Sequence, residues 1–255
     1  MSVTVDATAT FTSLSAGSPR NVNLTTSASA SAIVVVIGWS TTGGGTQPSA
    51  ITVKWDTAGA NQSFSLVSGA TGQSTGSNKD QADVWQLANP ASSGTKAITV
   101  AWTNANSGDI CAMSFIGTNT TTPCINGATS GQQNNAAPQL AITTANGGYA
   151  VGVCCYDNGV ITTVGQTTLF NDTGAPNANI FSNYAAATTT TTTLTGTLPG
   201  SSFWVYSGAF VQPAVVQPEN NGMTALIRVS RGPGWRWRAP PKGWKRQGGI
   251  LLKAA

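Results

Sequence analysis

Few residues of this chain could carry acid–base or nucleophilic chemistry. The 255 residues include eight Asp and Glu together and no His. The absence of His excludes Ser-His-Asp and Cys-His nucleophilic sites, and it also excludes His-ligated zinc. A glycosidase needs two carboxylates that face one cleft. The acids stand singly beside Gly, Asn, Thr or Lys, as turn residues do, at Asp56, Asp80, Asp109, Asp157 and Asp172. We expect turn chemistry there and predict no enzyme, no catalytic residue and no cofactor.

Oxygen ligands for a metal are equally sparse. Carboxylate and amide oxygens are adjacent at Asp157-Asn158 and at Asn171-Asp172, which leaves calcium as an alternative. A hard cation needs six or more oxygens, and each of these segments supplies two. We therefore expect no metal site.

The four cysteines do not have the spacing of a disulfide framework. Cys154 and Cys155 are adjacent, so in a strand their side chains would point to opposite faces. Cys111 and Cys124 could form a bridge only if the fold brings them together. We favour small buried thiols in a reducing compartment over disulfides.

The C-terminal segment has the most distinctive chemistry. Residues 228–255 contain eight Lys and Arg and no acid, whereas residues 1–227 contain four basic residues and eight acids. In an extended chain, Trp235 and Trp237 would share one face, and Arg236 and Arg238 the other. The rings could then enter a groove while the guanidinium groups pair with carboxylates. The residues expected to bind a partner are Arg228, Arg231, Trp235, Arg236, Trp237, Arg238, Trp244, Lys245, Arg246, Ile250, Leu251 and Leu252.

Three interpretations of this arm are open. It could anchor the chain to an acidic protein lattice, bind nucleic acid, or remain a solvated disordered tail. The anchor explains the tryptophans and the apolar end, whereas a lone disordered arm for nucleic acid would be unusual beside a surface-type sandwich. We favour the anchor over nucleic acid. Proline and glycine argue against an amphipathic membrane helix, so no membrane partner is expected.

The rest of the chain has the pattern of short strands. These segments are rich in β-branched and aromatic residues and are separated by Gly, Asn, Ser and Pro. Ile33–Ile37 is apolar at every position, which is typical of a central strand covered on both faces. Strands are predicted at 3–11, 21–26, 32–39, 51–55, 63–67, 83–87, 96–102, 110–116, 139–143, 148–156, 179–186, 189–194 and 202–210.

The predicted fold class follows from this pattern. We expect an all-β fold, namely a two-sheet antiparallel sandwich that is jelly-roll-like, with an extended C-terminal arm. The β-sandwich domain is expected to span 1–211, a linker 212–222, and the basic, Trp-rich arm 223–255. Trp39, Trp55, Trp85, Trp102 and Trp204 lie in or beside predicted strands, so we expect core packing before sugar binding.

The order of several motifs resembles a known module. Ala32–Trp39, Ile51–Trp55, the segment Val84–Pro90, Ile98–Trp102 and Trp204–Phe210 occur in this sequence in that order. The arrangement resembles a β-sandwich module of tailed-phage virion structural proteins, of the capsid decoration or fibre type, and of some bacterial surface proteins. The resemblance covers about residues 5–213. It implies a virion-surface module used for decoration, fibre building or receptor contact, and it carries no catalytic residue.

These observations give the expected function. We expect a phage virion structural protein, a capsid decoration or head-surface protein anchored by its C-terminal arm to the major capsid protein or another virion protein. Opposite charges on the sandwich and the arm favour a homo-oligomer, and such modules suggest a trimer. The alternative is a tail-fibre or receptor-binding module that recognises host surface glycans. The expected location is the virion surface after synthesis in the host cytoplasm, because the sequence shows no signal peptide.

Overall fold

The computed structural model describes residues 2–9, 12–13, 17–41, 46–74, 79–104, 107–156, 161, 163–175, 178–215, 226–227, 244–247 and 250–253. The chain divides into two compact units, Met1–Ala214 and Val215–Ala255. We call them the sandwich unit and the C-terminal unit. The division falls within the 212–222 segment that the sequence marks as a linker. Among the described residues there is no helix.

The first half of the sandwich unit contains ten strands in two sheets. Its inner sheet has the order β1-β10-β4-β8-β7, with β2 also paired to β10, and its outer sheet has the order β3-β9-β5-β6. All pairings are antiparallel. The strands are β1 (Thr4–Thr8), β2 (Thr12–Ser13), β3 (Arg20–Thr26), β4 (Ala32–Ser40), β5 (Ser49–Trp55), β6 (Gln62–Ser63), β7 (Ser65–Gln73), β8 (Gln81–Ala88), β9 (Gly94–Thr103) and β10 (Ser107–Ile116).

The second half repeats this plan with eight strands. Its inner sheet has the order β11-β18-β13-β16-β15, and its outer sheet has the order β12-β17-β14. The strands are β11 (Cys124–Asn135), β12 (Gln139–Thr143), β13 (Gly148–Tyr156), β14 (Thr163–Val164), β15 (Thr167–Ala175), β16 (Ala178–Ala187), β17 (Thr191–Thr197) and β18 (Ser202–Val211).

The two halves have the same strand order. In the first half, β1 pairs with β10, followed across the sheet by β4, β8 and β7. In the second half, β11 pairs with β18, followed across the sheet by β13, β16 and β15. Thus β10, β4, β8 and β7 of the first half correspond to β18, β13, β16 and β15 of the second. The long β11 corresponds to β1 and β2 together, since each pairs with the last strand of its half. The sandwich unit is therefore a tandem repeat of one β topology.

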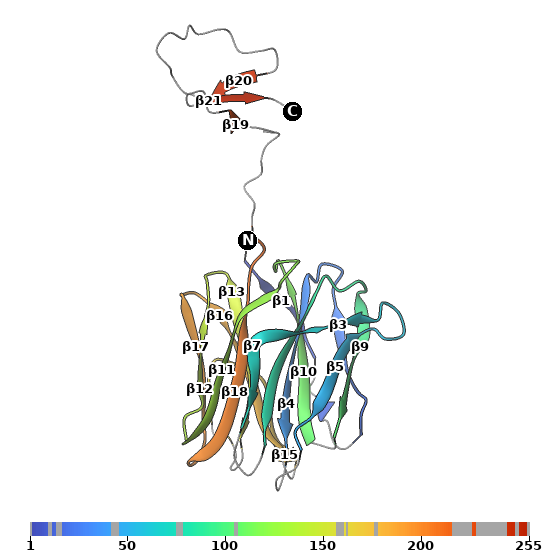
Figure 1. Ribbon diagram of the computed structural model, residues 1–255, viewed down its shortest axis with the longest axis vertical. Coiled ribbons are helices and arrows are strands. Elements are labelled where there is room, and N and C mark those ends of the chain that lie inside the picture. The colour runs from blue at the N-terminus through green and yellow to red at the C-terminus, as the bar shows by residue number, and fades with distance from the viewer. Residues whose placement is uncertain are drawn as a thin grey trace. The chain divides into compact units, whose positions relative to one another are not determined.

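Four sheets stack in the order outer, inner, inner, outer, with an apolar cluster in each space. The cluster between the first half's sheets includes Trp55, the cluster between the two inner sheets includes Met113, and the cluster between the second half's sheets includes Leu194. In Figure 1 the outer strands β3 and β9 lie on one side of the unit, and β12 and β17 lie on the other. The inner sheets are thus covered on both faces.

The burial of the inner strands explains their composition. Every residue of β4 is buried, as are nearly all of β13 and β18.

The all-β antiparallel sandwich that the sequence predicts is confirmed, with four sheets in place of two. The predicted strands at 139–143 and 148–156 have the observed bounds. The sequence analysis missed β11, which is rich in Gly, Gln and Asn, and β15, which contains Asn171-Asp172.

Glycines allow the inner sheets to approach closely. A Cβ on Gly38 would lie 2.5 Å from Cγ2 of Ile180 and 2.9 Å from Sγ of Cys155. A Cβ on Gly127 would lie 2.1 Å from the carbonyl oxygen of Ser68. At Gly38 the second half's side chains pack directly on the backbone, and at Gly127 two backbones meet. A larger side chain would not fit at either position.

The C-terminal unit contains a small antiparallel sheet of order β19-β21-β20. Its strands are β19 (Leu226–Ile227), β20 (Trp244–Gln247) and β21 (Ile250–Lys253). The arm was expected to run extended as a single strip, but β21 pairs antiparallel with β20, with Gln247 opposite Ile250. Two residues, Gly248-Gly249, separate the paired strands in the sequence, and this dipeptide is a hairpin signal.

Candidate functional site

Half of the predicted partner-binding residues lie in the sheet of the C-terminal unit. Trp244, Lys245 and Arg246 belong to β20, and the three apolar residues at 250–252 belong to β21. Lys245 is paired with Leu252, and Arg246 with Leu251. The hairpin thus brings basic and apolar positions side by side along the backbone. Outside the described residues lie Arg228, Arg231, Trp235, Arg236, Trp237 and Arg238.

The acids of the sandwich unit are mostly buried, which the sequence analysis did not anticipate. Asp80 and Asp109 are fully buried, Asp83 is 1% exposed, and Asp56 is 6% exposed. The expectation of turn chemistry is wrong for Asp109 and Asp172, which lie within β10 and β15. Gly or Asn beside an Asp did not indicate a turn here, because these residues also occur in the strands of the inner sheets.

Asp83 is held by three donors. Its carboxylate accepts hydrogen bonds from Oγ1 of Thr71 at 2.6 Å, Nε2 of Gln81 at 2.7 Å and Nε1 of Trp39 at 3.2 Å. Burial raises the pKa of Asp83, and these hydrogen bonds oppose that rise. The carboxyl is therefore a satisfied structural group inside the first half.

Asp109 has a different environment. Neither of its carboxyl oxygens has a hydrogen bond of normal geometry, and its neighbours include the carboxyl of Asp172 and the hydroxyl of Ser13. Burial raises the pKa of Asp109 to about 8, and the nearby charge of Asp172 adds to this effect. Asp109 belongs to the first half and Asp172 to the second, so the pair lies at the junction of the halves.

These carboxyls do not form a catalytic pair facing a cleft. Asp83 is opposite Ile37 and Asp109 is opposite Gly38 on β4. Because paired residues on neighbouring strands point to the same side, the two carboxyls lie on opposite faces of one sheet. Asp109 and Asp172 do meet, but Asp109 is fully buried. The described acids therefore offer no substrate-accessible acid–base pair.

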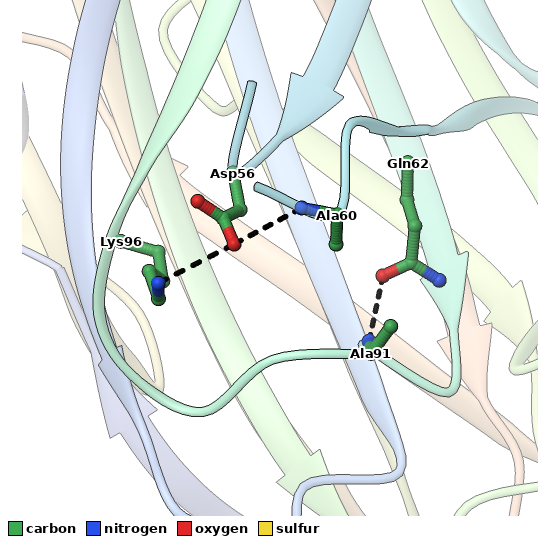
Figure 2. Close-up of polar contacts among 5 residues, drawn as sticks. All are labelled: Asp56, Ala60, Gln62, Ala91 and Lys96. Carbon is green, nitrogen blue, oxygen red and sulfur yellow. Dashed lines mark hydrogen bonds and ion pairs between the residues drawn. The ribbon is translucent and has the colours of Figure 1, made fainter. Parts of the chain in front are cut away.

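Asp56 is the acid for which turn chemistry is confirmed. Its Oδ2 accepts a hydrogen bond from the N–H of Ala60 at 3.2 Å and lies 3.4 Å from Nζ of Lys96 (Figure 2). Nearby, Oε1 of Gln62 accepts from the N–H of Ala91 at 2.7 Å. The N–H of Ala60 is the main cause of the lowered pKa of Asp56. These contacts fix two loops beside the outer sheet of the first half.

The tryptophans and cysteines of the sandwich unit are core residues, as expected. Trp39, Trp55 and Trp204 are fully buried and Trp102 is 6% exposed, while Trp85 packs partly buried against the same core. The four cysteines are free and buried. Burial raises the pKa of Cys111 and of Cys124 to about 12. The four buried tryptophans are thus not available as platforms for sugars.

One groove of about 570 Å³ opens where the halves join. It lies between β7 and the start of β11, and Leu66, Gln86, Ile125 and Asn126 are among the residues that line it. Oε1 of Gln86 is already engaged by the N–H of Cys124 at 2.7 Å. None of the described lining residues is charged, so the groove lacks the groups that would orient a charged ligand.

The described residues contain no group of three His, Cys, Asp or Glu placed to hold a metal ion. Of the two segments considered for calcium, Asp157-Asn158 lies outside the described residues and Asn171-Asp172 lies in β15. No helix with the length and apolar content of a membrane span occurs in the described part of the chain. Comparisons with protein-family models, with curated proteins and with solved structures gave no match.

Proposed function

We propose that this protein is a non-enzymatic structural protein of a phage virion, of the capsid decoration type, attached to an acidic partner through its C-terminal unit. The observation that carries the proposal is the separation of chemistry between the two units. The C-terminal unit holds eight of the chain's twelve basic residues. The sandwich unit buries most of its acids and its large aromatic residues.

The surface of the sandwich unit fits a display role. The outward positions of β3 and β17 are exposed Asn and Thr, such as Asn21, Asn23 and Thr193. Hydroxyls on neighbouring strands bond to one another, as Thr25 does with Thr95 at 2.8 Å. An uncharged, hydroxyl-rich strand such as β17 resists unspecific electrostatic adhesion, which suits a repeated coat element.

The partner of the C-terminal unit is proposed to be acidic and distinct from the sandwich unit. Four carboxyls of the sandwich unit are buried, and Asp6 is occupied by the N–H of Ser27 and the hydroxyl of Ser114. A clasp from one copy to the sandwich of the next would therefore find few accessible carboxylates among the described residues. An acidic surface of the capsid lattice would supply them.

The test measures binding to purified shells that lack the protein. The full chain is compared with the double variant Arg236→Gln, Arg238→Gln and with the matched double variant Lys54→Gln, Lys79→Gln. We expect the first variant to bind about tenfold or more weakly, because charge-assisted contacts are lost. The second, which removes equal charge from the sandwich unit, should bind like the parent chain. Binding of the parent should weaken as salt rises.

Three outcomes would argue against this assignment. Equal binding by both variants would remove the C-terminal unit as the anchor. Competition by a short DNA duplex would indicate a nucleic-acid arm. Binding of the full chain to host glycans, with no binding to shells, would favour the receptor-binding alternative, although four tryptophans of the sandwich unit are buried.

A further inference from the structure

Asp109 and Asp172 are two carboxyl groups that meet where the halves of the sandwich unit join. Asp109 lies on β10 and is paired with Ser13 of β2 and Gly38 of β4. Asp172 lies on β15, paired with Ile180 of β16. These strands belong to opposite halves, so the two carboxyls meet across the space between the inner sheets.

The packing leaves the pair little room to separate. Gly38, directly beside Asp109, is in such close contact with the second half that a Cβ there would strike Ile180 at 2.5 Å. Asp109 is fully buried, so water cannot screen its charge. Two ionised carboxylates held in this way would repel each other strongly, and one proton between them removes the repulsion.

Among the described residues, the other groups that face this position do not supply a positive charge. On β13, Cys155 approaches Gly38, and burial keeps its pKa well above the ordinary value. Tyr156, also on β13, is near enough to Asp172 for the two to interact, and burial raises its pKa to about 12. On β2 the neighbour is the hydroxyl of Ser13, and β16 contributes the apolar Ile180. Asp172 is the acidic neighbour that raises the pKa of Asp109.

We propose that Asp109 and Asp172 form a proton-operated latch between the two halves of the sandwich unit. One shared proton holds β2 and β10 against β15, and loss of that proton opens this edge. The latch is independent of the proposed function, because it concerns the sandwich unit alone.

The sign of the effect follows from proton linkage. Asp109 is protonated in the folded state up to about pH 8, whereas its ordinary pKa in an unfolded chain is 3.8. Between these values the folded state binds one more proton than the unfolded state. The stabilisation is fully present below pH 3.8 and is lost as pH rises to about 8. The unfolding equilibrium constant should therefore increase up to tenfold per pH unit from this group alone.

The test is urea unfolding of the full chain at several pH values between 5 and 9. We expect Asp109→Asn to reduce the dependence of the unfolding free energy on pH by the contribution of one proton. An amide stays neutral and can still donate to Asp172. The variant should be more stable than the parent at pH 9. The control Asp56→Asn should keep the parent's slope of unfolding free energy against pH between 5 and 9, because the pKa of Asp56 is lowered.

A second variant and a local measurement keep the test decisive. If Asp109→Asn does not fold, Asp172→Asn should lower the upper pH limit of the parent's slope, since the like charge is gone. Amide exchange at matched pH should show faster opening of β15 than of β17 in the parent at pH 9, and not in Asp109→Asn. An unchanged slope in both variants, or equal exchange of β15 in parent and variant, would overturn the latch.

Discussion

The two halves of the sandwich unit share one strand order but bury different polar groups. The first half contributes four buried carboxyls, of which Asp80, Asp83 and Asp109 are at most 1% exposed. The second half encloses neutral groups, of which Asn183 and Ser182 are fully buried. The amide nitrogen of Asn183 donates to the carbonyl oxygens of Gly165 at 2.9 Å and Thr195 at 3.1 Å.

The difference shows that topology does not determine the ionisation of an interior. The Oδ1 of Asn183 accepts from the hydroxyl of Tyr206, so this amide is satisfied on both sides without a charge. Asp83 is satisfied only as an acceptor, and Asp109 faces another acid. Unfolding should therefore respond to pH through the carboxyls of Asp83 and Asp109, whereas the amide of Asn183 should add no pH dependence.

The largest expected effect comes from deleting one buried tryptophan in each half. Trp39→Ala and Trp204→Ala should each cost about 3–5 kcal/mol of unfolding free energy, because both rings are fully buried.

The penalties of these two variants should differ in their pH dependence. Trp39 donates to Asp83, so its loss disfavours the charged carboxylate and the penalty grows as pH rises. Trp204 donates to the neutral Asn135 at 3.1 Å, so its penalty should be constant. Urea unfolding at pH 5 and pH 8 checks this, and parallel pH profiles would contradict it.

A smaller effect is expected from giving the second half an ionisable group. Asn183→Asp replaces a donor by an acceptor beside the carbonyls of Gly165 and Thr195. We expect a loss of about 3 kcal/mol at neutral pH, from the orphaned carbonyls and the buried charge, and a smaller loss at acid pH. Asn23→Asp, at an exposed position of β3, is the matched control and should be nearly neutral. Thermal melts of both variants at pH 5 and pH 8 measure the difference. Equal penalties at the two pH values would show that the interior amide does not set the pH response.

The contact between the halves can be tested with a glycine pair. Gly127→Ala places a Cβ 2.1 Å from the carbonyl oxygen of Ser68 and should cost about 1–3 kcal/mol. Gly131→Ala lies on the same strand with open space around the new methyl group, so its effect should stay within about 0.5 kcal/mol. Chemical unfolding of the two variants gives the comparison. Similar values would mean that the halves can shift apart at little cost.

The smallest effect is expected at the loops of Figure 2. Asp56→Asn should weaken the turn that the N–H of Ala60 and Lys96 support. Because the pKa of Asp56 is lowered, its contribution is present above the ordinary value of 3.8 and is lost as pH falls below it. The variant should flatten the acid limb of the stability profile and leave the alkaline limb unchanged. Melting temperatures between pH 2.5 and 7 check this, and an altered alkaline limb would contradict it.

The fold was predictable because hydrophobic alternation and turn residues mark strands locally. The apolar run Ile33–Ile37 predicted a strand covered on both faces, and the strand predicted at 139–143 is β12. The repeat of the topology was not found, because the two halves share strand order more than residues. Near the end of β4 the residues that face the outer sheet are Ile37 and Trp39, whereas near the end of β13 they are Cys154 and Tyr156.

The buried acids could not be predicted, since their burial arises from sheet stacking between distant segments. Asp109 meets Asp172 across 63 positions of sequence, and no local pattern encodes that approach. The hairpin of the C-terminal unit did have a local signal in Gly248-Gly249 between two short strand-like runs.

The position of β18 has a mechanical consequence. This last strand of the sandwich unit lies in the middle of its sheet, paired along its length with β11 on one side and β13 on the other. The chain leaves the unit directly after it, at Ala214. A load carried by the C-terminal unit would thus pull β18 along its axis and place both ladders in shear, so that many hydrogen bonds share the force. A strand at a sheet edge would instead be peeled away one bond at a time.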